Sequence, residues 1–133
     1  MIVVDASVAV PAVAEFGDRG TSALLRIHQD RSLAPHILDL EVTHVLRSMC
    51  TRGELSERVA RRGLQKLLSL KIIRVAHEPL LARCWELRHN VSAYDASYVA
   101  LAEQTGATLL TRDVRLARAP GIECEVELFG SAA

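Results

Sequence analysis

Met1-Ile-Val-Val-Asp5 opens the chain with an unbroken run of four apolar residues, three of which are β-branched. An acid follows this run at once. Such a short apolar run is typical of a parallel β-strand covered on both faces. A helical pattern follows over residues 6–16, with Pro11 expected in its first turn or at a kink and Gly17 at its end. This stretch therefore predicts a strand followed by a helix, with Asp5 where the strand ends.

The same alternation of strand and helix continues along the chain. Further strands are expected at residues 32–35, 71–75, 107–111 and 123–128, and helices at about 18–29, 37–52, 55–70, 78–88 and 92–103. Ser56 and Ser92 suit helix N-caps, as does either Asp18 or Thr21 for the helix over 18–29, and Gly106 suits a helix end. Strands that alternate with helices predict an α/β fold with a parallel sheet of about five strands and helices on both faces.

The composition indicates one domain and excludes binding that is driven by net charge alone. The 133 residues are 50% hydrophobic, enough for one core and too few for two, so we expect a single domain over residues 1–133. The 16 Lys and Arg residues balance the 16 Asp and Glu residues, so no net charge draws the chain to nucleic acid or to an acidic membrane. Any such binding needs a local patch. The single tryptophan, Trp85, is expected in the core.

The cysteines and the start of the chain indicate a compartment. Cys50, Cys84 and Cys124 are scattered and form no C-x-x-C pair, which argues against a disulfide framework or a thiolate metal site and favours buried thiols in a reducing environment. The first residues lack the basic segment of a signal peptide, and no apolar run reaches transmembrane length. We therefore expect a cytoplasmic protein without a membrane partner.

Two acids lie where predicted strands end. Asp5 follows the first strand, and Asp113 follows the strand over 107–111. In an open parallel sheet, ligands bind beyond the carboxyl ends of the strands, so both side chains should open onto the same edge. Asp95 lies near a predicted helix N-terminus. Glu41 lies about one turn into its helix and would reach the same edge if the start of that helix faces it.

Each acid also has an ordinary structural explanation, since Asp5 suits a helix cap and Asp95 suits the first turn of a helix. Asp113 suits a turn, and Glu41 suits an exposed helix face. Taken together, however, carboxylates in one pocket repel one another unless a cation neutralises them. An all-oxygen set favours Mg²⁺ or Mn²⁺, because Zn²⁺ usually brings His or Cys. We therefore predict a site for Mg²⁺, with Mn²⁺ as a substitute, held by Asp5, Glu41, Asp95 and Asp113.

Hydroxyl side chains accompany three of these acids. Ser7 and Ser97 each lie two residues after an acid, and Thr111 lies two residues before one. All three are candidates to orient carboxylates or waters, with Thr111 the strongest because it ends a strand. Ser7 and Ser97 are equally well explained as ordinary residues of first helical turns.

Four stretches also carry a resemblance to a known family. They are residues 2–7 (IVVDAS), 40–47 (LEVTHVLR), 94–103 (YDASYVALAE) and 109–117 (LLTRDVRLA). In order and spacing they resemble the PIN-domain ribonucleases, and within them the VapC-type toxins of bacterial toxin–antitoxin pairs. The resemblance implies a PIN-like sheet, an Mg²⁺- or Mn²⁺-dependent endoribonuclease and catalytic roles for Asp5, Glu41, Asp95 and Asp113. It also implies an RNA substrate, a small VapB-like antitoxin as partner, and a homodimer.

Several other residues near these stretches are candidates for contacts. His44 lies one turn after Glu41 on the same helix face, where related sequences often carry Asn, so it is a candidate for a pocket wall or a substrate contact, or is simply structural. Arg112, Arg115 and Arg118 are candidates to hold the RNA backbone, since phosphate contacts position a nucleic acid without reading its sequence. An antitoxin is an alternative partner for the same arginines.

Rival classes fit the sequence less well. A phosphorelay receiver domain also carries acids and magnesium at strand ends, but it needs an acidic pair near the first strand and a late lysine. Here Val4 precedes Asp5, and no lysine follows Lys71. A D-x-D phosphatase fails because Ser7 stands where its second Asp belongs. A catalytically silent PIN module that only binds RNA or protein stays open, although the presence of all four acids weighs against it.

Overall fold

The computed structural model describes residues 1–130 and contains a five-stranded sheet in which every pair of neighbouring strands is parallel. The strands, in the spatial order β3-β2-β1-β4-β5, are β1 (Ile2–Val4), β2 (Ser32–Pro35), β3 (Ile72–Val75), β4 (Thr108–Thr111) and β5 (Val126–Leu128). The predicted α/β fold with a PIN-like parallel sheet is confirmed. The last residues of the predicted single domain, 131–133, lie outside the described residues.

β1 occupies the centre of the sheet. Val3 is in register with Leu33 of β2 on one side and with Leu109 of β4 on the other. All three residues of β1 are buried, which explains the unbroken apolar run at the start of the sequence. The chain leaves β1 towards β2 and returns later to β4, so the space beyond the carboxyl ends of β1 and β4 is the switch point at which ligands bind in open α/β sheets.

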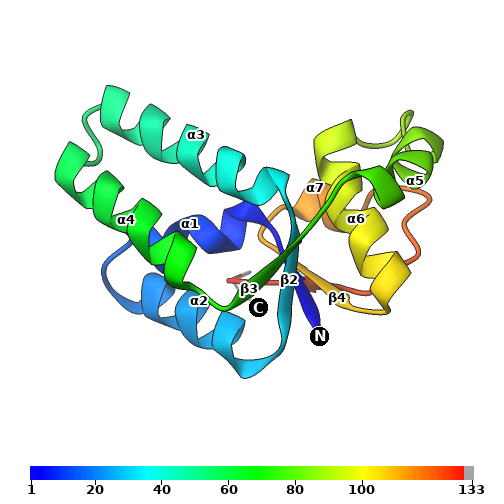
Figure 1. The fold of residues 1–133 in the computed structure, drawn as a ribbon, viewed down its shortest axis with the longest axis horizontal. Helices are drawn as coiled ribbons and strands as arrows, with labels where there is room; N and C mark the ends of the chain where they lie inside the picture. The colour runs from blue at the N-terminus through cyan, green and yellow to red at the C-terminus, as the bar shows by residue number, and fades with distance from the viewer. Residues whose placement is uncertain (131–133) are drawn as a thin grey trace.

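Helices cover both faces of this sheet, as Figure 1 shows. On one side lie α1 (Ala6–Ala14), α2 (Asp18–Gln29), α3 (Ile37–Thr51) and α4 (Glu57–Ser69). On the other side lie the 3₁₀ turn Glu78–Leu80, α5 (Leu81–Glu86), α6 (Ala93–Thr105) and α7 (Val114–Ala117). α1 and the middle of α6 are buried almost throughout, because these two helices lie directly against the strands.

Helix ends follow the expected capping residues at two places. The Ser56 hydroxyl accepts a hydrogen bond from the Val59 amide at 3.2 Å, and the Ser92 hydroxyl accepts one from the Asp95 amide at 3.1 Å. Each bond satisfies an amide that has no partner within its own helix. α6 then ends at Gly106, whose φ of 70° lies in the left-handed region that favours glycine.

The predicted cap of α2 was wrong. Neither Asp18 nor Thr21 caps α2, because within the described chain Gly17 occupies the cap position without a side-chain bond. Asp18 is instead the first residue of α2, where its negative charge suits the helix dipole. Of the two alternatives expected for Pro11, the first turn is excluded because Pro11 lies inside α1, and a kink stays a prediction. Burial of the apolar residues around it outweighs the hydrogen bond that proline cannot donate.

Trp85 was predicted in the core, but it is 67% exposed. Leu80, Cys84 and Leu87 recur at helical spacing and take the buried positions of this short segment, which leaves Trp85 on the outer face. The guanidinium of Arg88 lies over the indole ring, 4.4 Å from its centroid. Trp85 is therefore a surface residue held in a cation–π contact.

Other boundaries differ from the expected ones by a few residues. The helix expected over 78–88 splits into the 3₁₀ turn and α5, and the strand expected over 123–128 begins at Val126. The cysteines are free thiols as expected, but Cys84 is buried while Cys50 and Cys124 are half-buried. Within residues 1–130, no helix has both the length and the apolarity needed to cross a membrane.

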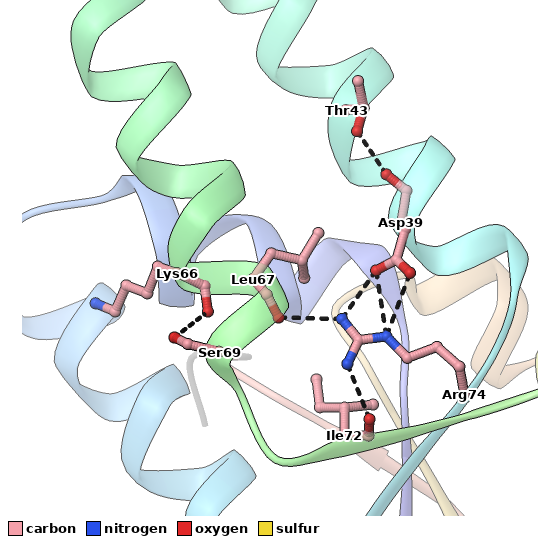
Figure 2. A network of polar contacts seen from close by, with 7 residues as sticks. All are labelled: Asp39, Thr43, Lys66, Leu67, Ser69, Ile72 and Arg74. Atoms are coloured by element: carbon pink, nitrogen blue, oxygen red, sulfur yellow. Dashed lines mark hydrogen bonds and ion pairs between the residues drawn. The ribbon is translucent and has the colours of Figure 1, made fainter.

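A partly buried ion pair fixes the start of α3 against the sheet (Figure 2). Arg74 of β3 donates from Nη2 to Asp39 Oδ1 at 2.9 Å and from Nε to both carboxylate oxygens at 3.3 Å. The same guanidinium donates to the carbonyl oxygens of Leu67 at 3.0 Å and Ile72 at 2.8 Å. Arg74 thereby ties β3 and the end of α4 to the first turn of α3, two residues before Glu41.

Candidate active site

Asp5 is the most buried acid beyond the carboxyl ends of β1 and β4. It occupies the single position between β1 and α1 and is 7% exposed. Its Oδ2 accepts hydrogen bonds from Ser7 Oγ at 2.6 Å and from Thr111 Oγ1 at 2.8 Å. Within the described residues this carboxylate makes no capping bond to α1. Helix capping therefore does not account for Asp5, and its side chain is aimed towards the end of β4 instead.

Thr111 connects Asp5 to Asp113. Thr111 is fully buried as the last residue of β4, and while its hydroxyl donates to Asp5 it accepts a bond from the Asp113 amide at 3.0 Å. The Ser7 hydroxyl likewise accepts a bond from the Arg112 amide at 2.9 Å. These are the contacts that the expected orienting role of Ser7 and Thr111 requires, and they join the ends of β1 and β4.

Asp113 combines a structural contact with a position in the site. It is the N-cap of α7, and its Oδ1 accepts hydrogen bonds from the amides of Arg115 at 2.9 Å and Leu116 at 3.3 Å. The Arg115 side chain lies 4.0 Å from the same oxygen but is 95% exposed, so solvent screens this ion pair. The expected turn role of Asp113 is thus present, and it fixes the carboxylate beside the end of β4.

Asp95 faces the other acids from the first turn of α6. It is half-buried, and its pKa is raised by this burial and by the negative charges of Asp5 and Asp113. A cavity of about 300 Å³ is lined by both Asp95 and Asp113, together with Ser92 and Arg115. Asp95 is therefore close enough to two other carboxylates to feel their charge, with open space beside it.

Glu41 lies in α3 and does not occupy an exposed helix face. It is half-buried, and its Oε1 accepts a hydrogen bond of 2.5 Å from the hydroxyl of Tyr98, a residue of α6. Its pKa is raised, first by burial and then by the charges of Asp5 and Asp95, although the Tyr98 bond acts in the opposite direction. The four acids Asp5, Glu41, Asp95 and Asp113, which we call the carboxylate cluster, are therefore coupled electrostatically across four elements of the fold.

A second cavity, of about 470 Å³, adjoins the cluster on the side of α3. Glu41 and His44 both line it, with Leu40 and Tyr94 among the remaining wall residues. His44 is exposed and lines this cavity. A substrate contact through His44 stays a prediction.

Two further expectations concern residues beside the cluster. Ser97 was a candidate to orient Asp95, but its hydroxyl donates to the Tyr94 carbonyl at 2.6 Å, so it serves its own helix. Arg112 contributes its backbone amide to the hydroxyl network, whereas Arg115 and Arg118 are exposed at the surface. A phosphate contact by these arginines stays a prediction.

The donor set of the cluster suits a hard divalent cation. It consists of carboxylate oxygens whose negative charges raise the pKa of Glu41 and Asp95, and a cation between them would relieve that repulsion. Within residues 1–130, no three His, Cys, Asp or Glu side chains are already arranged to hold an ion. We therefore expect that fewer than three of these side chains bind the ion directly and that water completes its coordination, as is common for Mg²⁺ in proteins.

The family of this chain follows from its similarity to known proteins. The model of the PIN domain matches residues 2–122. The chain belongs to the PIN-domain family. Ribonuclease VapC1 of Mycobacterium tuberculosis is 46% identical over 129 residues, which cover 95% of this chain and 96% of that protein. The resemblance to VapC-type PIN ribonucleases is thus confirmed, and a receiver domain or a D-x-D phosphatase is excluded.

Solved structures agree on the fold. The toxin VapC20 of Mycobacterium tuberculosis, which cleaves the sarcin–ricin loop, superposes with a TM-score of 0.69 at 19% identity, covering 92% of this chain and 97% of that one. VapBC2 of Rickettsia felis, solved bound to a DNA fragment from its promoter, gives a TM-score of 0.70 at 16% identity, covering 97% of this chain and 99% of that one. At these identities the likeness establishes the PIN fold.

The sequence patterns did not predict the contact made by Tyr98. This residue is fully buried, and its hydroxyl donates a hydrogen bond to Glu41. One signal was available, since Tyr98 lies three residues after Asp95 and thus on the same side of α6. A tyrosine one turn from a candidate metal ligand is a reason to look for an acceptor of its hydroxyl.

Proposed function

We propose that this VapC-type ribonuclease is a metal-dependent endoribonuclease, with the carboxylate cluster of Asp5, Glu41, Asp95 and Asp113 as its catalytic and metal-holding residues. The observation that carries the proposal is the convergence of four carboxylates at the switch point beyond β1 and β4, where burial and the charges of neighbouring acids raise the pKa of Glu41 and Asp95. Mg²⁺ is the proposed ion, with Mn²⁺ as a substitute, because the donors are oxygens.

The chain supplies geometry and charge to this reaction. Ser7 and Thr111 hold Asp5 through one carboxylate oxygen, and the amides of α7 hold Asp113. A bound divalent ion would supply Lewis-acid stabilisation of the phosphoryl oxygens and would lower the pKa of the attacking water. The cavities beside Asp95 and Glu41 give an RNA backbone room to approach the carboxylates from two sides.

The test is cleavage of a mixed RNA pool by purified protein, with Mg²⁺ or Mn²⁺ and with EDTA. The proposal expects cutting that requires metal and is lost in Asp95→Asn. Glu57→Gln is the matched control, because Glu57 is an acid in an exposed pair on α4, and this variant should cut at the wild-type rate. Binding of RNA without cutting at any metal concentration would instead indicate a silent PIN module.

The proposed partners follow from the family and from the VapBC2 complex among the structural relatives. We propose a small VapB-like antitoxin that blocks the site and a homodimer as the state of the isolated toxin, acting in the cytoplasm. Expression of the chain alone should arrest bacterial growth, and co-expression of a cognate antitoxin should restore it. Expression of Asp5→Asn without antitoxin should not arrest bacterial growth. Light scattering of the purified chain measures its oligomeric state, and a monomer would contradict the dimer.

A further inference from the structure

Tyr98 forms a contact that joins two elements carrying acids of the cluster. It is fully buried in α6, and its hydroxyl donates to Glu41 Oε1 in α3 at 2.5 Å, across 57 positions of sequence. Tyr98 lies three residues after Asp95, so one helix presents both an acid of the cluster and a donor to another acid.

The identity of the acceptor distinguishes Tyr98 from an ordinary core tyrosine. Two other hydroxyls of α6 bond within their own helix, since Ser97 donates to the Tyr94 carbonyl at 2.6 Å and Thr105 donates to the Leu101 carbonyl at 2.7 Å. A phenylalanine would fill the same buried space as Tyr98 without a polar atom. The hydroxyl is thus not needed for packing, and it is bonded to a half-buried carboxylate of the site.

Glu41 is held from two sides. Its helix is anchored two residues earlier, where Asp39 pairs with Arg74 (Figure 2), which fixes the backbone. The side chain has freedom of its own, and the Tyr98 bond restrains it by engaging Oε1. Among the described residues, Tyr98 is the only side chain found to donate a hydrogen bond to Glu41. One carboxylate oxygen is thereby fixed, and among the described residues no side chain donates a hydrogen bond to the other.

We propose that Tyr98 is a positioning residue that holds the Glu41 carboxylate in the orientation in which it binds the divalent ion. The inference rests on the proposed function, because it concerns the same site. Tyr98 does not touch the ion or the RNA, and it acts through Glu41. Groups that orient metal ligands are worth roughly 10- to 100-fold in metal affinity or activity when removed.

The experiment measures Mn²⁺ binding by calorimetry without RNA, for the wild type and for Tyr98→Phe. Binding should weaken by roughly 10-fold in Tyr98→Phe. Thr105→Val is the matched control, because it removes a hydroxyl from the same helix that bonds only to backbone, and it should bind Mn²⁺ like the wild type. Thermal unfolding of each variant shows whether a change in binding merely follows a loss of stability.

A double-variant cycle separates positioning from a general effect on the fold. In a Glu41→Gln background the ligand is already lost, so adding Tyr98→Phe should not weaken Mn²⁺ binding further. Unchanged binding in Tyr98→Phe, or the same loss in both backgrounds, overturns the role assigned to Tyr98. If the wild type binds Mn²⁺ no better than Asp95→Asn, the proposed metal site fails, and the role of Tyr98 fails with it. Loss in Asp95→Asn with wild-type binding in Tyr98→Phe overturns this inference alone.

Discussion

Replacing Thr111 by Val removes one hydroxyl from the buried contact between the ends of β1 and β4 and keeps the shape of the side chain. In the wild type this hydroxyl donates to Asp5 Oδ2 at 2.8 Å and accepts from the Asp113 amide at 3.0 Å. Thr111 is 0% exposed, so water does not readily replace either bond. The substitution therefore measures how much the end of β4 contributes to holding Asp5.

The expected magnitude follows from these two bonds. A hydrogen bond to a charged group contributes roughly 1.5–3 kcal/mol, and a bond between neutral groups about 0.5–1.5 kcal/mol. Ser7 still donates to Asp5 at 2.6 Å in the variant, so the carboxylate keeps one partner. Thr111→Val should lower the free energy of unfolding by about 2–3 kcal/mol. It should also weaken Mn²⁺ binding by roughly 10-fold, because Asp5 loses part of its orientation.

Urea unfolding without metal measures the first effect, and calorimetry measures the second. Thr108→Val in the same strand is the matched control, because Thr108 begins β4 at the end away from Asp5 and is only half-buried. This control should change the free energy of unfolding by less than about 0.5 kcal/mol and leave Mn²⁺ binding unchanged. Equal stability and equal binding in the two variants would refute the role assigned to the Thr111 hydroxyl.

Three further predictions concern the scaffold. In Gly20→Ala the added Cβ would lie 2.2 Å from the Glu15 carbonyl oxygen, so α1 and α2 must shift. Urea unfolding should show a free energy of unfolding lower by about 1–3 kcal/mol, and wild-type stability would argue against this close approach. Hydrogen bonds from Arg26 lower the pKa of Glu127, so the ionised carboxylate stabilises the fold by about 0.5 kcal/mol at pH 7 relative to Glu127→Gln. This difference in the free energy of unfolding should disappear as the pH falls below 4.5 and through the lowered pKa, and a difference that persists at pH 2 would contradict the prediction. Arg74→Met removes the ion pair with Asp39 at the start of α3 and should lower the melting temperature by several degrees. An unchanged melting temperature would mean that this ion pair contributes nothing to stability.

The elements were predictable where one local pattern decides them. β1 is buried on both faces, so all of its residues are apolar and the strand could be predicted from this unbroken run. Ser56 and Ser92 mark helix starts because a hydroxyl at that position bonds to the amide three residues later, whatever the rest of the chain does. Asp5 and Asp113 were placed at one sheet edge because the carboxyl ends of parallel strands share it.

Other features depend on contacts between distant residues, and the sequence does not contain them in a readable form. Trp85 lies in a short helix, and packing against α6 decides which face of that helix is buried. The Tyr98–Glu41 bond joins positions that come together only once α3 and α6 are in place. The Ser7 and Ser97 hydroxyls looked equivalent in sequence, yet one bonds to Asp5 and the other to its own helix.

The proposed reaction requires a divalent ion in the carboxylate cluster. Crystals of the wild type soaked in Mn²⁺, with data collected at a wavelength where manganese scatters anomalously, locate such an ion independently of activity. We predict an anomalous peak beyond the ends of β1 and β4, bound by Asp5 and at least one other acid of the cluster and absent in Asp95→Asn crystals. A wild-type crystal with no peak there, or with manganese only at exposed surface acids, would contradict the central claim.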